Sequence, residues 1–343
     1  MGQLGDSKGS RLQVIRFFSS FQTRAFFIAV LGLTPPQLLS DQLSDNPTTG
    51  VQWLLGMRKA ATTLNYHGVV AYIKDQQIDS FKLYHQVVDG RERERLVAMN
   101  SPFREVLRED GNVARYTADT HQVVVETKPS NQSVLISLPE DASQLDRYYQ
   151  INLRGQEYVA GALTQVVALE PRDAYRYSRL LWIDTTTHLP LKLEVLNEDG
   201  MSVEQMVFTT INTKDPIPPQ DLQPSVQAAS AITQISHRET LPVDGLKWTF
   251  TSVPDGFQLV SYSVLKRPPL NSPVEHILMS DGFSSVSVYI EKRDSRIKPG
   301  ARKIGAAAVE SVKLGDLEVT VMGEVPQKTV ELIANGVRKK GDN

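Results

Sequence analysis

The sequence predicts a β-rich α+β protein built mostly from antiparallel sheets. Short runs of β-branched and aromatic residues recur along most of the chain, and turn pairs such as Asp89-Gly90 and Gly111-Asn112 separate them. Strands joined by tight turns favour antiparallel pairing over alternating βαβ units. The length of 343 residues exceeds the usual size of one compact domain, so we expect two.

The composition excludes several classes of function. The chain is 41% apolar and 22% charged with a net charge of -2, which is ordinary for a soluble globular protein and gives no reason to expect a nucleic-acid partner. It contains no cysteine, so disulfides and thiolate metal sites are excluded. The absence of cysteine does not distinguish cytosol from periplasm.

The first 40 residues have the layout of a leader for export. Three arginines precede a short apolar run at residues 25–33, and no acidic residue lies between Asp6 and Asp41. The run is too short for a transmembrane helix, which needs about 20 apolar residues. No small-x-small cleavage pattern follows it, and the alternatives are an uncleaved leader or a buried core helix. We expect residues 1–40 to be a signal or leader segment.

The block at residues 50–211 is expected to form the first domain. Its opening segment, residues 51–65, places Trp53, Met57 and Leu64 near helical spacing, which predicts an amphipathic helix. The polar stretch at residues 139–147 is expected to be a loop or a short helix. Strand-like runs occupy residues 66–74, 78–88, 91–99, 104–110, 113–119, 121–128, 148–164, 177–196 and 201–210, the last two joined by a turn at 197–200.

A proline-rich stretch then separates two blocks. Residues 212–230 carry four prolines and almost no apolar periodicity, which is typical of a flexible linker. Residues 231–338 are expected to form a second, smaller β-rich domain that closes with a helix at 326–337. Pro326 suits a helix start, and an apolar stripe follows it. The strand-like runs of this block are residues 240–250, 256–266, 283–292, 305–314 and 317–325.

The sequence offers no catalytic, metal or cofactor site. The six histidines are scattered singly, without the spacing that brings two of them to one ion. The serine elbow G-x-S-x-G is absent, as are the phosphate-binding patterns G-x-x-x-x-G-K-S/T and G-x-G-x-x-G. We therefore expect no enzyme, and an envelope hydrolase is an alternative without any motif behind it.

One charge pattern is a candidate binding surface. In a strand, Arg91, Arg93 and Arg95 share one face, and Glu92 and Glu94 share the other. Such a row of guanidinium groups can bind phosphate or carboxylate. The alternative is a solvated strand whose charges prevent edge pairing.

Apolar residues near the first helix are candidates for a lipid pocket. A helix laid against a large antiparallel sheet can leave an apolar space between them, which would suit an acyl chain. Ordinary core packing is the alternative for the same side chains. The candidates are Trp53, Met57, Tyr66, Trp182 and Leu189.

Spaced segments over residues 51–337 resemble the RseB/MucB-type regulators of sigma-E-type stress responses. In the first block these are Trp53-Leu54-x-x-Met57, Leu64-Asn65-Tyr66-x-Gly68, Leu181-Trp182-Ile183-Asp184 and Leu189-Pro190-Leu191. In the second block they are Trp248, Val253-Pro254-Asp255-Gly256-Phe257, the segment 280–288 (SDGFSSVSV) and the segment 319–326 (VTVMGEVP).

The resemblance implies a periplasmic protein whose first domain has the half-barrel fold of lipoprotein carriers. It implies binding to the periplasmic region of a membrane anti-sigma factor, protection of that region from proteolysis, and release by lipopolysaccharide or another envelope lipid. A periplasmic lipid or lipoprotein carrier is the alternative function, and a homo-oligomer is left open. On the matched segments, the partner-binding candidates besides the arginine row are Trp248, Phe257, Asp281, Phe283 and Glu324.

Overall fold

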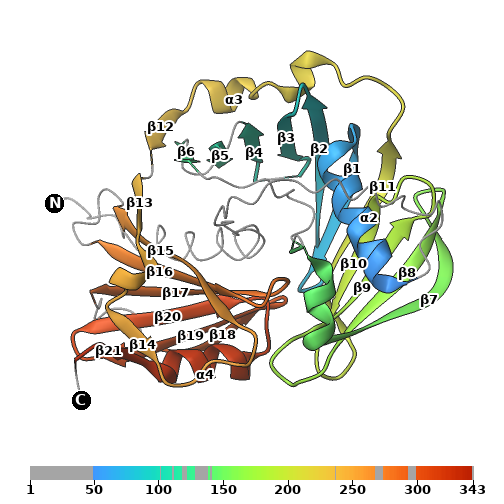
Figure 1. The fold of residues 1–343 in the computed structure, drawn as a ribbon. Coiled ribbons are helices and arrows are strands. Elements are labelled where there is room, and N and C mark those ends of the chain that lie inside the picture. Colours follow the sequence, from blue (N-terminus) through green and yellow to red (C-terminus); the bar gives the residue numbers. More distant parts are fainter. Residues whose placement is uncertain are drawn as a thin grey trace, which may run out of the picture.

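The computed structural model describes residues 49–100, 102–109, 112–117, 122–127, 138–139, 141–235, 237–266, 273–292 and 299–341. The predicted leader and the turn residue Gly111 lie outside these ranges. Within them, no helix is long and apolar enough to cross a membrane. The strands form a twelve-stranded sheet, a seven-stranded sheet and a two-stranded ribbon, almost all antiparallel, which confirms the predicted fold class (Figure 1).

The first helix is α2 (Gly50–Thr63), as predicted. It begins at a capping box: the Gln52 amide donates to the Thr49 hydroxyl at 3.2 Å, and the Thr49 amide donates to the Gln52 side chain at 3.1 Å. Trp53, Leu54 and Met57 lie on its buried face.

The large sheet consists of two antiparallel meanders and one added strand. Its order is β12-β6-β5-β4-β3-β2-β1-β11-β10-β9-β8-β7, so the pairing of β1 with β11 joins the meanders. The meander strands are β1 (Tyr66–Lys74), β2 (Gln77–Val88), β3 (Arg91–Ala98), β4 (Arg104–Glu109), β5 (Asn112–Thr117), β6 (Gln122–Thr127), β7 (Tyr149–Val159), β8 (Ala162–Pro171), β9 (Ser178–Asp184), β10 (Pro190–Leu196) and β11 (Ser202–Asn212).

Turn residues account for where these strands end. Asp89 and Gly90 both have positive φ, 51° and 75°, as a tight hairpin turn requires. The predicted turn at 197–200 is also present, because the Asn197 side chain accepts the amides of Asp199 and Met201 at 3.1 and 2.8 Å.

The predicted strand at residues 177–196 was wrong in one respect, since it is two strands, β9 and β10. Between them the Asp184 carboxylate accepts the amides of Thr186 and Thr187 at 2.6 and 3.1 Å, which turns the chain. The polar stretch at 139–147 contains the short 3₁₀ helix η1 (Ala142–Arg147).

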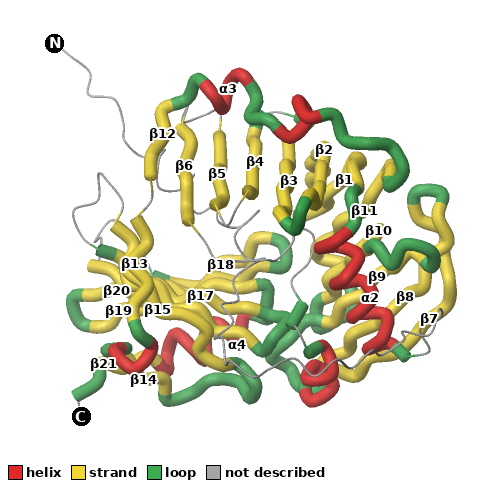
Figure 2. Tube along the Cα trace, turned by 45° about the horizontal axis from the view of Figure 1, so that its top comes forward, coloured by secondary structure: helices red, strands yellow, loops and turns green. Residues whose placement is uncertain are grey.

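The large sheet curves into a half-barrel, with α2 on its inner face (Figures 1 and 2). Helix α2 contacts β2 from one meander and β7 and β8 from the other. Its apolar face packs in one core with inward side chains of the sheet, such as Leu83, Leu181 and Phe208. Burial of these side chains is the main force that holds helix and sheet together.

The proline-rich segment is attached to the first sheet. It contains η2 (Pro219–Leu222) and α3 (Val226–Ala229), and it leads into β12 (Ile232–Ile235), which pairs in parallel with β6. The Glu105 carboxylate on β4 accepts the Ser225 hydroxyl at 2.5 Å, and Arg95 on β3 donates to the Asp221 carbonyl at 3.0 Å. The segment predicted as a flexible linker is therefore bonded to β3 and β4.

The second sheet has the order β13-β15-β16-β17-β20-β19-β18. A single residue separates the end of β12 from the start of β13. Strands β14 and β21 form a separate ribbon. The strands are β13 (His237–Leu241), β14 (Trp248–Phe250), β15 (Gln258–Lys266), β16 (Val274–Ser280), β17 (Ser285–Lys292), β18 (Gly300–Ile304), β19 (Ala307–Leu314), β20 (Leu317–Gly323) and β21 (Val337–Lys339), with the 3₁₀ turn η3 (Val243–Gly245) before β14.

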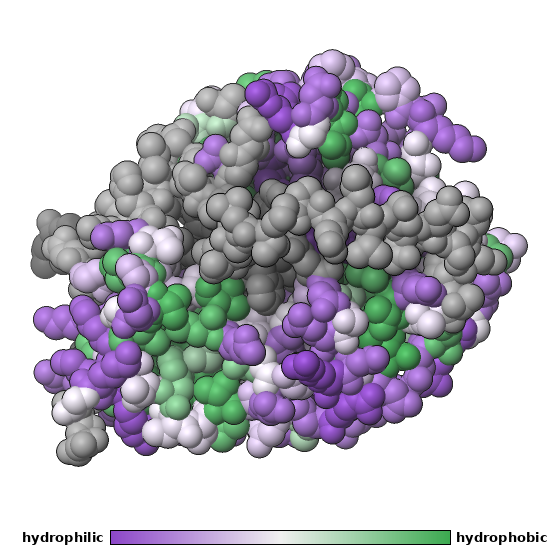
Figure 3. Space-filling view, in the orientation of Figure 1, coloured by the Kyte–Doolittle hydropathy of each residue, from purple (hydrophilic) through white to green (hydrophobic). Residues whose placement is uncertain are grey.

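The predicted C-terminal helix is α4 (Gln327–Gly336). It covers the face of the second sheet that is turned away from β4–β6 (Figure 1). Its stripe of Val330, Ile333 and Ala334 is buried in the core of this sheet. Figure 3 shows hydrophilic side chains along much of the rim of the first domain and apolar ones over part of the second.

Candidate functional site

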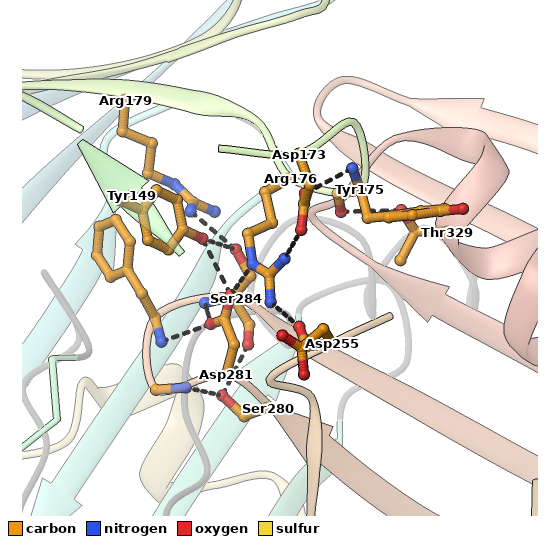
Figure 4. Close-up of polar contacts among 12 residues, drawn as sticks. Tyr149, Asp173, Tyr175, Arg176, Arg179, Asp255, Ser280, Asp281, Ser284 and Thr329 are labelled. Carbon is orange, nitrogen blue, oxygen red and sulfur yellow. Dashed lines mark hydrogen bonds and ion pairs between the residues drawn. The ribbon is translucent and has the colours of Figure 1, made fainter. Parts of the chain in front are cut away.

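The two sheets meet at a buried polar cluster, which we call the interdomain junction. From the first sheet it contains Tyr149 on β7, the loop at residues 172–177 and Arg179 on β9. From the second it contains the loop at 253–257 and the turn at 280–284 (Figure 4). Glu324, which follows β20, also belongs to it. These segments lie far apart in the sequence, so the fold alone brings them together.

Arg176 is the centre of the junction. Its Nε atom and the carboxylate of Asp281 form an ion pair in which both side chains have 0% exposure. Its Nη2 atom donates to the Asp255 carbonyl at 2.5 Å, and Nη1 is paired with Asp173. One side chain from the first sheet thus binds two groups of the second.

Aromatic rings complete the environment of Arg176. The guanidinium carbon lies 4.8 Å from the ring centre of Tyr148 and 4.9 Å from that of Phe257, within cation–π distance of one ring from each sheet. Burial lowers the pKa of Arg176, but the carboxylates of Asp281 and Asp173 outweigh this, and the pKa is raised. Arg176 therefore keeps its charge.

Asp281 holds its own turn as well as Arg176. Its Oδ1 atom accepts the amides of Phe283 and Ser284 at 2.8 and 2.6 Å, while Oδ2 accepts the Tyr149 hydroxyl at 3.1 Å. The turn needs Gly282, whose φ of 102° disfavours other residues. This carboxylate links the shape of the turn to the contact between the sheets.

A chain of hydroxyl groups extends the network from Asp281. A carboxylate only accepts, so Tyr149 donates its one proton to Asp281, and the Ser284 hydroxyl, 3.0 Å away, donates to Tyr149. Arg179 in turn donates to Ser284 at 3.1 Å. Burial, and then the negative charge of Asp281, raise the pKa of Tyr149 and keep it protonated.

Arg179 forms the second charged contact across the junction. Its Nη2 atom lies 3.6 Å from Oε2 of Glu324, and its guanidinium carbon lies 4.6 Å from the ring centre of Phe283. Phe283 also packs edge-on against Tyr149, with ring centres 5.8 Å apart. Each buried cation thus has a carboxylate and an aromatic ring from the second sheet.

Close backbone approach marks two further points of contact. Gly256 has a φ of +85°, and a Cβ atom there would lie 2.4 Å from Cζ of Tyr148. Gly305 donates its amide to the Asp75 carboxylate at 3.0 Å. The start of α4 adds a bond from the Thr329 hydroxyl to the Tyr175 carbonyl at 2.8 Å.

Four of the partner-binding candidates lie in the junction. Phe257, Asp281, Phe283 and Glu324 all face groups of the first sheet, as described above. Trp248 lies in the core packed against the second sheet, where its indole nitrogen donates to Glu275 at 2.9 Å. A role for these residues in binding a partner stays a prediction.

The arginine row lies on the outer face of β3. Arg93 is paired with Glu109, and Arg95 donates from Nε to Glu105 at 2.6 Å, both on β4, whereas Arg91 is exposed. Two of the three guanidinium groups are thus matched by carboxylates of the neighbouring strand. Binding of an anion by this row stays a prediction.

The lipid-pocket candidates are all buried side chains. Trp53, Met57, Tyr66 and Leu189 have exposures between 0% and 3%. Trp182 alternates with inward-facing neighbours on β9, so it lies on the other face, where its indole nitrogen donates to Glu157 at 2.8 Å. Lipid binding by these residues stays a prediction.

Sequence reasoning missed the first-sheet half of the junction. Tyr149, Asp173, Arg176 and Arg179 carry no motif, although four charged and two aromatic residues crowd into residues 172–179. That density within a short loop was the available signal. Among the described residues, no group of three or more His, Cys, Asp or Glu side chains could hold a metal ion.

Comparisons with known proteins match both halves of the chain. Residues 49–226 match the family described as the MucB/RseB N-terminal domain, and residues 243–338 match the MucB/RseB C-terminal domain. The Escherichia coli (strain K12) sigma-E factor regulatory protein RseB is 28% identical over 323 residues, covering 92% of this chain and 98% of RseB.

A second relative comes from Pseudomonas aeruginosa. Its sigma factor AlgU regulatory protein MucB is 30% identical over 294 residues, covering 83% of this chain and 90% of MucB. Two solved structures show MucB together with MucA. The P. aeruginosa MucA/MucB complex aligns with a TM-score of 0.69, 28% identity and coverage of 85% of this chain and 99% of that one. MucB in complex with MucA(peri) aligns with a TM-score of 0.65, 27% identity and coverage of 84% and 98%.

Proposed function

The chain belongs to the MucB/RseB family, and from this premise we propose that it is a periplasmic negative regulator of an envelope-stress sigma factor. It holds the periplasmic region of a membrane anti-sigma factor and shields that region from proteolysis. The observation that carries the proposal is the match over 85% of the chain to MucB in a structure that also contains MucA. The relatives are named as regulatory proteins, which supports a non-enzymatic role.

We propose that the partner peptide contacts both domains. The proposed division is a first domain at residues 50–211, a linker at 212–230 and a second domain at 231–338, with β12 reaching back to the first sheet. The junction fixes the orientation of one sheet relative to the other. It therefore also fixes the shape of the surface that the two sheets form together. Buried charges matched as in the Arg176–Asp281 pair favour one arrangement over others, since any displacement leaves a charge unpaired.

The partner peptide is released if lipid binds more tightly to a different arrangement of the two domains. A ligand shifts an equilibrium between two arrangements only by its differential affinity for them. An acyl chain that entered the first core beneath α2 would displace Trp53 and Met57, both of which are buried there. We propose that this movement weakens the hold on the peptide, with lipopolysaccharide or a related envelope lipid as the effector.

A binding and competition experiment with the full chain tests the proposal. A labelled peptide of the cognate anti-sigma factor's periplasmic region is titrated with the protein, and lipopolysaccharide or phosphatidylcholine vesicles are then added. We expect saturable binding that lipopolysaccharide reverses and phosphatidylcholine does not. Uptake of lipid without any binding of the peptide would instead support a lipid or lipoprotein carrier. No binding of either would overturn both readings.

A further inference from the structure

A second buried charged cluster lies on the inner face of the half-barrel, where α2 ends. It contains His85 on β2, Glu92 and Glu94 on β3 and Arg108 on β4, and we call it the inner cluster. The side chains of His85 and Glu94 are 0% and 1% exposed, Arg108 is 8% exposed and Glu92 is 18% exposed. The interdomain junction uses none of these residues.

Both ring nitrogens of His85 face oxygen atoms that accept hydrogen bonds. Nδ1 lies 2.7 Å from the Leu64 carbonyl, which can only accept, so Nδ1 carries a proton. Nε2 lies 2.9 Å from Oε1 of Glu92. The same Oε1 atom accepts an N–H from Arg108, which favours an ionised carboxylate there. With acceptors on both sides, the ring needs a second proton.

The inner cluster holds two carboxylates and one arginine. Arg108 pairs with Glu92 and places its Nε 3.2 Å from Oε2 of Glu94, so one guanidinium faces two carboxylates. The imidazolium supplies the second positive charge. Arg115 on β5 is one further cation on this face, diagonal to Arg108 across β4 and β5. The neighbouring α2 and β1 contribute the Leu64 carbonyl and the Tyr66 ring.

The ring of His85 is also held mechanically. Tyr66 stacks on it with ring centres 4.7 Å apart and a 14° angle between planes. The Tyr66 hydroxyl donates to the Ala61 carbonyl in α2 at 3.2 Å. His85 and Tyr66 together therefore bond two carbonyls in the last turn and cap of α2, and the last turn itself has no basic side chain.

We propose that His85 is a buried, proton-dependent clasp that fixes the C-terminal end of α2 to β2 and β3, and that loss of its second proton frees this end. Because α2 covers the first core, the clasp controls access to that core. The direction of regulation follows: the helix is held at acidic and neutral pH and loosened at alkaline pH.

The pKa of His85 agrees with this geometry. Burial lowers it, but the hydrogen bond to Glu92 and the charge of Glu94 outweigh burial, and the net pKa is raised above its ordinary value. A group with a raised folded-state pKa stabilises the fold fully below its unfolded-state pKa. That contribution disappears as pH rises through the folded-state pKa.

Nitrogen-15 NMR of the full-length protein tests the clasp directly. At pH 7 we expect both His85 nitrogens to have the chemical shifts of an imidazolium. The pH midpoint at which these shifts change should lie above that of an exposed histidine. Hydrogen exchange of residues 50–65, corrected for the intrinsic effect of pH, should increase through the same transition. A His85 ring that is neutral at pH 6.5 overturns the proposal, whatever the variants do.

Two variants separate the clasp from general effects of pH. Glu92→Gln removes the carboxylate that faces Nε2, so His85 should become neutral at pH 7 and exchange at the end of α2 should increase about tenfold, or 1.4 kcal/mol. His67→Gln is the matched control, because His67 lies on the adjacent strand β1 and stacks on Tyr84 outside the inner cluster. Equal exchange in Glu92→Gln and wild type would also refute the clasp.

Discussion

Arg176 and Asp281 form an ion pair between the two sheets with both side chains fully removed from solvent. Around this pair, Tyr149, Arg179 and Thr329 each contact a group of the opposite sheet. We therefore expect the junction to act as one cooperative unit, whose contacts break together.

Removing the carboxylate of Asp281 should strongly destabilise the protein. Asp281→Ala leaves Arg176 charged and buried and takes away the acceptor of two turn amides, so we expect a loss of about 3–5 kcal/mol in the free energy of unfolding. Asp255→Ala is the control, because Asp255 is exposed and contributes only its backbone carbonyl, and it should cost less than about 0.5 kcal/mol. Urea denaturation measures both, and equal losses would contradict the central role of Asp281.

Substitution of Gly256 should push the two sheets apart. Gly256→Ala combines strain at a φ of +85° with a clash against Tyr148, and we expect it to cost about 1–3 kcal/mol more than Gly161→Ala. Gly161 is matched for conformation, with a φ of +80° and no atom within 4 Å of an added Cβ. Adding Tyr148→Ala to Gly256→Ala should restore part of the loss. Equal losses of unfolding free energy for the two glycine variants would show that Tyr148 moves away from the added Cβ atom without destabilising the protein.

The proline-rich segment should detach when Glu105 is removed. The Glu105 side chain is 2% exposed and accepts from both Arg95 and Ser225, so Glu105→Ala leaves the Arg95 side chain, 11% exposed, without its carboxylate. We expect a loss of about 3 kcal/mol and faster proteolysis at residues 219–230. Glu109→Ala removes an exposed ion pair with Arg93 and should cost about 0–1 kcal/mol. Limited proteolysis that is unchanged in Glu105→Ala would show that the segment is held in another way.

The stabilisation by His85 should depend on pH in one direction. The pKa of His85 is raised in the folded protein, so the difference in unfolding free energy between wild type and His85→Gln should be greatest near pH 6. It should shrink as pH rises through the folded-state pKa. Thermal or urea denaturation from pH 6 to 9 measures the trend, and a difference that grows with pH would contradict it.

Loosening the junction should weaken the proposed hold on the anti-sigma peptide. Asp281→Asn keeps a turn acceptor but removes the charge that pairs with Arg176, so the arrangement of the domains becomes less uniform. We expect peptide affinity to fall roughly 5–150-fold, the usual range for coupled sites. Asp255→Ala again serves as the control. If titration calorimetry gave an unchanged peptide affinity for Asp281→Asn, peptide binding would not depend on the junction.

Local structure was predictable where side chains alternate or turn residues punctuate the chain. The helix at α2, the turn at Asp89-Gly90 and the apolar stripe of α4 follow from spacing alone. Strand β16 was missed because it is buried on both faces and lacks alternation. The joining of the meanders through β1 and β11 depends on pairing between residues at least 130 positions apart, which no local pattern encodes.

The junction was predictable only in half. Asp281 and Phe283 were named because they lie in a segment that resembles a known family, and the structure places them where the sheets meet. Arg176 could not be paired with Asp281 from sequence, because the partner of a buried charge is set by the fold and not by spacing. The inner cluster was hidden for the same reason, since it brings together side chains of three strands.

Strand β12 ends at Ile235 and β13 begins at His237, so a single residue carries the chain from one sheet to the other. The two Cα–Cα steps from Ile235 to His237 span at most about 7 Å, so the ends of β12 and β13 cannot separate further than that. If the junction opened while β12 stayed paired with β6, the halves could pivot about this point but could not drift apart. A peptide could then enter between the two halves only by their rotation. The gap between the halves would widen with distance from that pivot.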